Sequence, residues 1–382
     1  MSDYLDRRKF MKETAIRASG LAFLPFLEEE IKVSKVVLSK SKPALTFLSP
    51  RLKFGVIGIN HGHIYSMSNS VIQGGGELHS FYAKEDDLAK DFLTRFPKSK
   101  RVTSEEEIYQ NSELKLILSA AIPDVRAEIG IKAMLSGKDY LADKPAITTL
   151  KQLEEVRKVQ KQTGRIFSIA FSERFENRAT VKAGELIKAG AIGKVIQTIG
   201  LGPHRTSLKT RPEWFFDKKR YGGILTDIAS HQFDQFLFFT NSTQAHVVSS
   251  QAGNVNHGQY PLFEDFGDVM LKGNGGMGYI RVDWFTPNGL KSWGDGRLTI
   301  LGTEGYIEIR KNIDITKSDN GNHLYLVNNK EAIYMDCAKE PLPFGQQLVD
   351  DVLNRTETAM TQAHCLLAME LALKAQKSAK TI

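Results

Sequence analysis

The sequence contains little cysteine and no long hydrophobic run, and both absences limit what the protein can be. Only two cysteines, Cys337 and Cys365, occur among 382 residues. They lack the spacing of metal ligands, so we expect no metal site and two free thiols rather than a disulfide. No segment reaches the roughly 20 consecutive apolar residues that cross a bilayer, so we expect no permanent membrane span.

Basic residues outnumber acidic ones, but they form no patch. The formal net charge of +7 is spread along the chain, and basic residues in the first fifty positions raise it. No stripe of lysine and arginine with interleaved aromatics is present, so a nucleic-acid partner is not expected. A hydrophobic content of 41% and a charged content of 25% are typical of a globular protein. The length favours two domains, and we find no internal repeat.

Residues 1–48 have the character of a leader followed by a linker. Arg7 and Arg8 precede a basic stretch, and the moderately apolar residues 15–27 come next. This order resembles a twin-arginine signal peptide. We therefore expect export to the periplasm by the twin-arginine machinery, with a polar linker from Ser34 to Pro50. The alternative is an amphipathic N-terminal helix of a cytoplasmic protein.

A strand, a turn and a helix are indicated by residues 53–63, which read KFGVIGINHGH. Gly58 opens a tight turn of the kind that brings backbone N–H groups to a pyrophosphate. Of the G-x-G-x-x-G fingerprint only Gly58 is intact, because Asn60 and His63 occupy the other two positions. Asn60 is a plausible substitute because asparagine tolerates left-handed backbone. Taken alone, the pattern fits a strand–turn–helix without a ligand equally well.

The second strand, expected at Leu78–Ala83, lacks the acid that usually binds the ribose of a dinucleotide. Lys84 and Glu85 follow instead. Lys84 could face a 2′-phosphate and Glu85 could reach a ribose, or both could be solvated turn charges. The sequence leaves NAD and NADP open.

Strands alternate with helices as far as Ala170, which predicts a doubly wound parallel sheet over residues 49–170. Leu114–Ala121 is typical of a central strand, and Pro123 follows it. Asp143-Lys144-Pro145 ends a later strand. A lysine at the carboxyl edge of such a sheet can polarise a substrate oxygen; alternatively, Lys144 is a surface residue in a turn.

A third informative stretch is GGILTDIASH at residues 222–231. Asp227 and His231 are four residues apart, so one helix presents both on one face. A histidine of near-neutral pKa suits proton abstraction from an alcohol, with Asp227 orienting it or holding a substrate hydroxyl. A structural, hydrogen-bonded pair in the core fits the pattern equally well.

Residues 171–382 are predicted to form a second, α+β domain with an open, largely antiparallel sheet. One face of that sheet must be covered by helices or by another subunit, and the second option implies a homodimer or homotetramer. Arg174 and Arg178 lie one helical turn apart and could bind substrate oxygens or form ion pairs. Trp214 precedes GGILTDIASH and could line a pocket.

Together and in this order, GVIGINHGHI, DKP and GGILTDIASH resemble the glucose–fructose oxidoreductase, inositol dehydrogenase and MocA family from Arg51 to the C-terminus. The resemblance implies a Rossmann domain, a C-terminal open-sheet domain, and chemistry on a sugar or cyclitol hydroxyl with NAD or NADP. By resemblance Lys144 matches the catalytic lysine and His231 the acid/base, while Arg126 stands where many members carry histidine. The implied cofactor contacts are Gly58, Ile59, Asn60, His61, Gly62, Lys84, Pro123, Lys144 and Pro145.

Our hypothesis is an exported NAD(P)-dependent oxidoreductase acting on a carbohydrate. Two alternatives remain open at this point. One is a redox-assisted glycosidase or lyase that recycles a bound cofactor, and the other is a non-catalytic protein that binds a sugar or nucleotide on the same fold.

Overall fold

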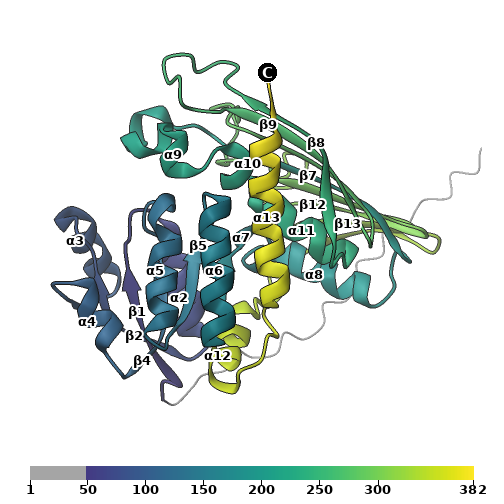
Figure 1. Cartoon of the computed structure of the whole chain (residues 1–382). Coiled ribbons are helices and arrows are strands. Elements are labelled where there is room, and N and C mark those ends of the chain that lie inside the picture. The colour runs from purple at the N-terminus through teal and green to yellow at the C-terminus, as the bar shows by residue number, and fades with distance from the viewer. Residues whose placement is uncertain (1–48) are drawn as a thin grey trace, which may run out of the picture. The chain divides into compact units, whose positions relative to one another are not determined.

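The computed structural model describes residues 49–382 (Figure 1). The expected twin-arginine signal, in residues 1–48, lies outside the described residues. Within residues 49–382, no helix combines the length and the apolar character that crossing a membrane requires.

The first sheet has six strands, all parallel, in the order β3-β2-β1-β4-β5-β6. The strand order reverses between β1 and β4, which is the doubly wound arrangement predicted from the sequence. Every residue of β5 is buried, as expected of a parallel strand covered on both faces. The strands are β1 (Leu52–Ile57), β2 (Gly76–Tyr82), β3 (Lys100–Arg101), β4 (Leu114–Ser119), β5 (Asp139–Asp143) and β6 (Phe167–Ala170).

Helices connect these strands, and some of them pack against one another in pairs. Figure 1 shows α5 and α6 side by side, and these two helices are in contact. Helix α2 contacts α12 from the far end of the chain, so the C-terminal helices return to the first sheet. Thr149 and Gln152 form a capping box at the start of α6. The helices are α2 (His63–Gln73), α3 (Asp86–Arg95), α4 (Glu105–Gln110), α5 (Pro123–Leu135), α6 (Leu150–Thr163) and α12 (Phe344–Asn354).

The second sheet has nine strands in the order β14-β13-β12-β11-β7-β10-β9-β8-β15. Only the β7–β10 and β8–β15 pairs are parallel, so the predicted open and largely antiparallel sheet is confirmed. The strands are β7 (Val195–Pro203), β8 (Ala245–Gly253), β9 (Phe266–Gly273), β10 (Met277–Asp283), β11 (Arg297–Gly302), β12 (Gly305–Arg310), β13 (His323–Asn328), β14 (Ala332–Asp336) and β15 (Lys380–Thr381).

Helices cover one face of the nine-stranded sheet. α11 lies on β7 and β10, α8 on β12 and β13, and α13 on β8, while α13 also contacts α6 of the first domain. The opposite face exposes large apolar side chains. The strand register places them in neighbouring rows: Ile199, Met270, Met277, Leu301 and Tyr306. The helices introduced here are α8 (Arg178–Lys188), α11 (Ser230–Thr240) and α13 (Gln362–Ser378).

The single helix expected to present Asp227 and His231 is interrupted. It forms α10 (Ile224–Asp227) and α11, because Ala229 N–H bonds to Ile224 five residues back and His231 N–H to Ile228 three residues back. Both linking residues keep right-handed helical angles, so the two segments remain in similar register. Sequence patterns also missed the short elements β3 and α4. Cys337 and Cys365 are free, as predicted, and both are buried.

Candidate active site

The turn after β1 is fixed by its glycine and by backbone hydrogen bonds to both neighbouring strands. Gly58 has φ of +77°, and a Cβ there would lie 2.5 Å from the Cβ of Ala121. Gly58 N–H donates to Tyr82 O at 3.0 Å, and Gly58 O accepts from Ala120 N–H at 3.0 Å. A Cβ at Gly62 would meet nothing within 4 Å, so open space lies in front of the turn.

Asn60 does not play the role expected of it. Its φ is not positive, because the tight turn is accommodated at Gly58. Its side-chain amide instead donates to Glu85 Oε1 at 2.9 Å. Glu85 is half-buried beside the turn, whereas Lys84 is exposed. An acidic side chain therefore lies beside the turn two residues after Ala83, where the sequence lacks one.

Asp143, at the end of β5, is fully buried among three cationic or ionisable side chains. His61 Nδ1 and His63 Nδ1 each lie 2.9 Å from one of its carboxylate oxygens, and Arg126 Nη2 lies 3.0 Å away. Burial acts to raise the pKa of Asp143, but Arg126 and the two histidines outweigh it and hold the pKa well below its usual value. The carboxylate is thus kept ionised.

The His61, His63 and Asp143 group could in principle hold a metal ion, since its ligand atoms lie within 4.8 Å of one another. No metal site was expected from the sequence, because His61 and His63 are far from Asp143 along the chain. One feature opposes a cation here, since the Arg126 guanidinium already lies against the same carboxylate.

Arg126, in α5, is hydrogen-bonded to the turn that carries Lys144. It is 1% exposed, and its Nη1 donates to Lys144 O at 2.7 Å and to Pro145 O at 3.1 Å. Its Nε donates to Ala121 O at 2.6 Å. The guanidinium therefore ties the ends of β4 and β5 together, and it positions Lys144 through the backbone.

Lys144, Asp227 and His231 meet in one place. Lys144 Nζ lies 3.0 Å from Asp227 Oδ1, and both side chains are largely buried. Burial acts to raise the pKa of Asp227, but the Lys144 ammonium outweighs it and lowers the pKa. His231 is 2% exposed, and its Nδ1 has no hydrogen-bond partner among the described residues. Burial lowers the pKa of His231 to about 3, against the opposing effect of Glu173.

Glu173 forms a second buried charge cluster beside His231. It accepts from Lys311 Nζ at 2.5 Å and from Gln232 Nε2 at 2.8 Å. Burial acts to raise the pKa of Glu173, but Lys311 outweighs it and keeps the carboxyl ionised. Glu173 lies in the short helix α7 (Ser172–Phe175), so this cluster joins the end of the first sheet to the second.

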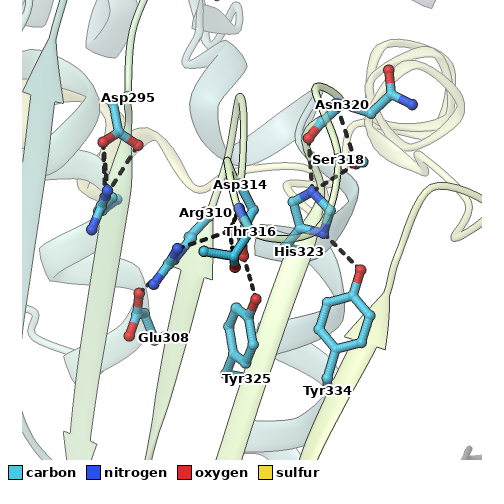
Figure 2. A network of polar contacts seen from close by, with 11 residues as sticks. Asp295, Glu308, Arg310, Asp314, Thr316, Ser318, Asn320, His323, Tyr325 and Tyr334 are labelled. Carbon is cyan, nitrogen blue, oxygen red and sulfur yellow. Dashed lines mark hydrogen bonds and ion pairs between the residues drawn. The ribbon is translucent and has the colours of Figure 1, made fainter. Parts of the chain in front are cut away.

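The loop between β12 and β13, which contains Lys311, is held by a network of polar contacts at the end of the nine-stranded sheet (Figure 2). Asp314 accepts hydrogen bonds from Arg310, from Thr316 and from the Tyr325 hydroxyl. His323 bridges the carbonyl of Asn320 and the hydroxyl of Tyr334. The network fixes the two ends of the loop, from which Lys311, Asn312 and Asn322 contribute to the cavity described next.

These groups surround a cavity of about 560 Å³, a size suited to a small molecule. Of the residues predicted from sequence, those that line it are His61, Pro123, Lys144, Trp214, Asp227 and His231. Lining residues that the sequence analysis missed include Glu173, His204, Arg211, Trp284, Trp293 and Lys311. Predicted residues outside its lining are Gly58, Ile59, Asn60, Gly62, Lys84, Pro145 and Arg174.

Of the two roles that the sequence allows for Arg174, the structure shows the ion pair. Its Nε and Nη2 each donate to a carboxylate oxygen of Asp234 at 2.7 Å, and both side chains are buried. Arg178 begins a separate helix, so the two arginines do not share one helical face. Arg174 is fully engaged in a structural ion pair.

Acid should destabilise this protein from about pH 6 downwards. Burial lowers the pKa of His204 to about 4 and that of His231 to about 3. Below the unfolded value of 6.5, the unfolded chain binds these protons and the folded chain does not, so stability is present at neutral pH and is lost as pH falls. His231 alone should contribute about 1.4 kcal/mol per pH unit to the loss. Urea unfolding between pH 7 and pH 5 measures how the free energy of unfolding depends on pH. In His231→Gln the slope of this dependence should decrease by about 1.4 kcal/mol per pH unit, the contribution of one proton. An unchanged slope in that variant would contradict the assignment.

The fold and the site together define a two-domain α/β protein with a dinucleotide-type turn beside a lysine–aspartate–histidine cluster. The model of the GFO/IDH/MocA C-terminal domain matches residues 180–308. A crystal structure from Erwinia carotovora atroseptica SCRI1043, provisionally named an oxidoreductase, is 45% identical with a TM-score of 0.85, covering 87% of this chain and all of that one. The chain belongs to the GFO/IDH/MocA family.

Two further relatives carry more specific names. The 1,5-anhydro-D-fructose reductase of Ensifer adhaerens is 24% identical over 204 residues, which cover 52% of this chain and 59% of that protein. The chain thus spans between half and two thirds of this curated relative. The structure of levoglucosan dehydrogenase with NADH has a TM-score of 0.69 at 17% identity, covering 86% of this chain and 98% of that one. That likeness shows the fold alone.

Proposed function

We propose that this chain is a nicotinamide-dinucleotide-dependent oxidoreductase acting on a carbohydrate hydroxyl. The observation that carries the proposal is the meeting of Lys144, Asp227 and His231 at one cavity, which His61 of the β1–α2 turn also lines. The names of the relatives, a sugar reductase and a sugar dehydrogenase that binds NADH, support it.

The residues of the β1–α2 turn fit a dinucleotide. The N–H groups of Asn60 and Gly62 have no acceptor among the described residues, and Gly62 faces open space. Such N–H groups at a helix N-terminus suit a pyrophosphate. We propose that residues 58–62 hold the cofactor, with Pro123 and Lys144 beside it. When bound, a nicotinamide dinucleotide supplies the hydride acceptor or donor.

Lys144, Asp227 and His231 would bind the oxygen of the substrate hydroxyl and transfer its proton. Lys144 donates a hydrogen bond to the substrate oxygen and stabilises negative charge that develops on it. Asp227 holds the ammonium in place at 3.0 Å. His231 takes the hydroxyl proton during oxidation and returns it during reduction. Burial lowers its pKa to about 3, so it is neutral but a weaker base than the near-neutral histidine expected from the sequence. Arg126 is a positioning residue, because it holds the backbone of Lys144.

Glu85 favours NAD over NADP in this proposal. Its carboxylate is bonded to Asn60 in the turn, where a carboxylate accepts hydrogen bonds from ribose hydroxyls and repels a 2′-phosphate. Lys84, the residue that could face a 2′-phosphate, is exposed.

Gly58→Ala should abolish or strongly weaken nucleotide binding. The added methyl would lie 2.5 Å from Ala121 and would force the turn open. Gly137→Ala is a matched control, because Gly137 has the same φ of +77° and a Cβ there meets nothing within 4 Å. We expect the Kd for NADH to rise at least tenfold in Gly58→Ala and to stay unchanged in Gly137→Ala, as measured by fluorescence titration. Equal binding by both variants would count against the turn as the nucleotide site.

We further propose that residues 49–170 form the nucleotide domain and residues 171–382 the substrate and oligomerisation domain. The apolar side chains exposed on the uncovered face of the nine-stranded sheet, such as Met270 and Met277, support a homodimer or homotetramer. Twin-arginine export and a periplasmic location stay predictions from residues 1–48. Phenol release from aryl glycosides without added cofactor would favour the redox-assisted glycosidase instead.

A further inference from the structure

Arg211 lines the cavity and forms no ion pair with a carboxylate of residues 49–382. It follows the short 3₁₀ helix η1 (Leu208–Thr210) and is half-buried. Its Nε donates to Thr206 O at 2.9 Å. The guanidinium carbon lies 4.4 Å from the ring centre of Phe215 and 5.1 Å from that of Trp284. These contacts fix the guanidinium plane at the cavity wall.

No carboxylate of residues 49–382 forms an ion pair with Arg211, although the other cavity cations are engaged. Arg205 donates to three backbone carbonyls. Burial lowers the pKa of Arg211, as expected for a charge without a close partner. The ion pairs of the remaining cations are Lys144–Asp227, Arg126–Asp143 and Lys311–Glu173. Among the described residues, Arg205 and Arg211 are thus the two cavity arginines without a carboxylate partner, and Arg211 makes fewer hydrogen bonds to carbonyl oxygens.

We propose that the substrate is a sugar acid whose carboxylate binds Arg211. The inference rests on the proposed function and names its substrate class. A guanidinium matches the planar carboxylate in geometry and balances its single charge. A phosphate monoester, which carries up to two charges, is the competing anion and is compared in the test below. Trp284 and Trp293, which also line the cavity, offer flat apolar faces to the C–H surface of a sugar ring.

Arg211 and Lys144 line the same cavity, so one small molecule can contact both. The Asp227 carboxylate acts on Arg211, raising its pKa against the effect of burial, and Asp227 is paired with Lys144. A carboxylate on Arg211 and a hydroxyl on Lys144 therefore fit within one cavity of about 560 Å³. A uronate or an aldonate carries both groups.

The test compares matched acid and neutral probes on the full chain with its nucleotide bound. Calorimetry measures the affinities of D-glucuronate against D-glucose, D-galacturonate against D-galactose, and D-gluconate against D-glucitol. We expect at least one acid to bind tenfold or more tightly than its neutral counterpart. Arg211→Gln should lose that preference, and Arg211→Lys should retain part of it. Lys209→Gln removes an exposed charge from the same loop and should keep the preference in full.

Three results would overturn the proposal: no acid binds more tightly than its neutral counterpart, the preference survives in Arg211→Gln, or D-glucose 6-phosphate binds more tightly than every carboxylate. Nucleotide retention by Arg211→Gln verifies that its fold is intact, and Arg211→Lys provides the comparison if it is not. Absence of any nicotinamide nucleotide from the wild-type chain is a different result, because it would refute the proposed function rather than the substrate class.

Discussion

Lys144→Met should lower kcat/KM by a factor of 10² to 10³ and leave the bound nucleotide in place. The variant removes the ammonium that we propose donates to the substrate oxygen, and the expected loss of transition-state stabilisation is about 2.7–4 kcal/mol. It also leaves Asp227 without the cation 3.0 Å away that keeps it ionised. Steady-state kinetics with the sugar that the wild-type enzyme oxidises fastest measures the effect.

Lys138→Met is the matched control for this variant. Lys138 is also buried, and it immediately precedes β5, the strand that Lys144 follows. Its Nζ donates to Tyr109 O at 2.6 Å, and it does not line the cavity. The control loses stability without losing turnover per folded molecule. If both variants lose the same turnover, the effect of Lys144→Met is structural and its catalytic role is refuted.

Arg126→Met should cost about 3–5 kcal/mol of folding stability, because it leaves the buried Asp143 without its guanidinium partner. It should also lower kcat in the molecules that remain folded, since Arg126 holds the carbonyls of Lys144 and Pro145. Urea unfolding measures the first effect, and turnover per folded molecule measures the second.

Arg174→Met is the control that separates the positioning of Lys144 by Arg126 from the general loss of stability when a buried ion pair is removed. Arg174 forms a buried, two-point ion pair with Asp234 and does not line the cavity. Arg174→Met should lower the folding stability about as much as Arg126→Met does, but it should leave kcat per folded molecule unchanged. If the two variants have the same kcat, then Arg126 stabilises the fold and does not position Lys144.

The order of elements and the residues at strand ends could be predicted from the sequence because both depend on local patterns. Buried parallel strands give continuous apolar runs, and the residue after a strand end lies at the sheet edge where ligands bind. Lys144, which follows β5, was found in this way. The four-residue spacing of Asp227 and His231 survived a break in the helix, because the linking residues keep helical angles.

The rest of the site depends on contacts between distant segments, which leave no local pattern. Glu173 and Lys311 are 138 residues apart in sequence and meet only because the chain crosses from one sheet to the other. Arg174 was chosen over Glu173, its neighbour, although only Glu173 lines the cavity. The conformation of Asn60 was misjudged because Gly58 alone provides the positive φ of the turn. The Asn60 amide instead donates to Glu85 on the next strand–helix connection.

Mass spectrometry of the nucleotide released on denaturation tests the central claim most directly. The purified chain is incubated with D-glucuronate and D-glucose in which every carbon-bound hydrogen is deuterium. We predict that wild-type protein releases a nicotinamide dinucleotide that has gained one deuterium, and that Lys144→Met releases the same nucleotide without it. Absence of any nicotinamide nucleotide, or equal deuterium gain in both proteins, would contradict a hydride-transfer site built around Lys144.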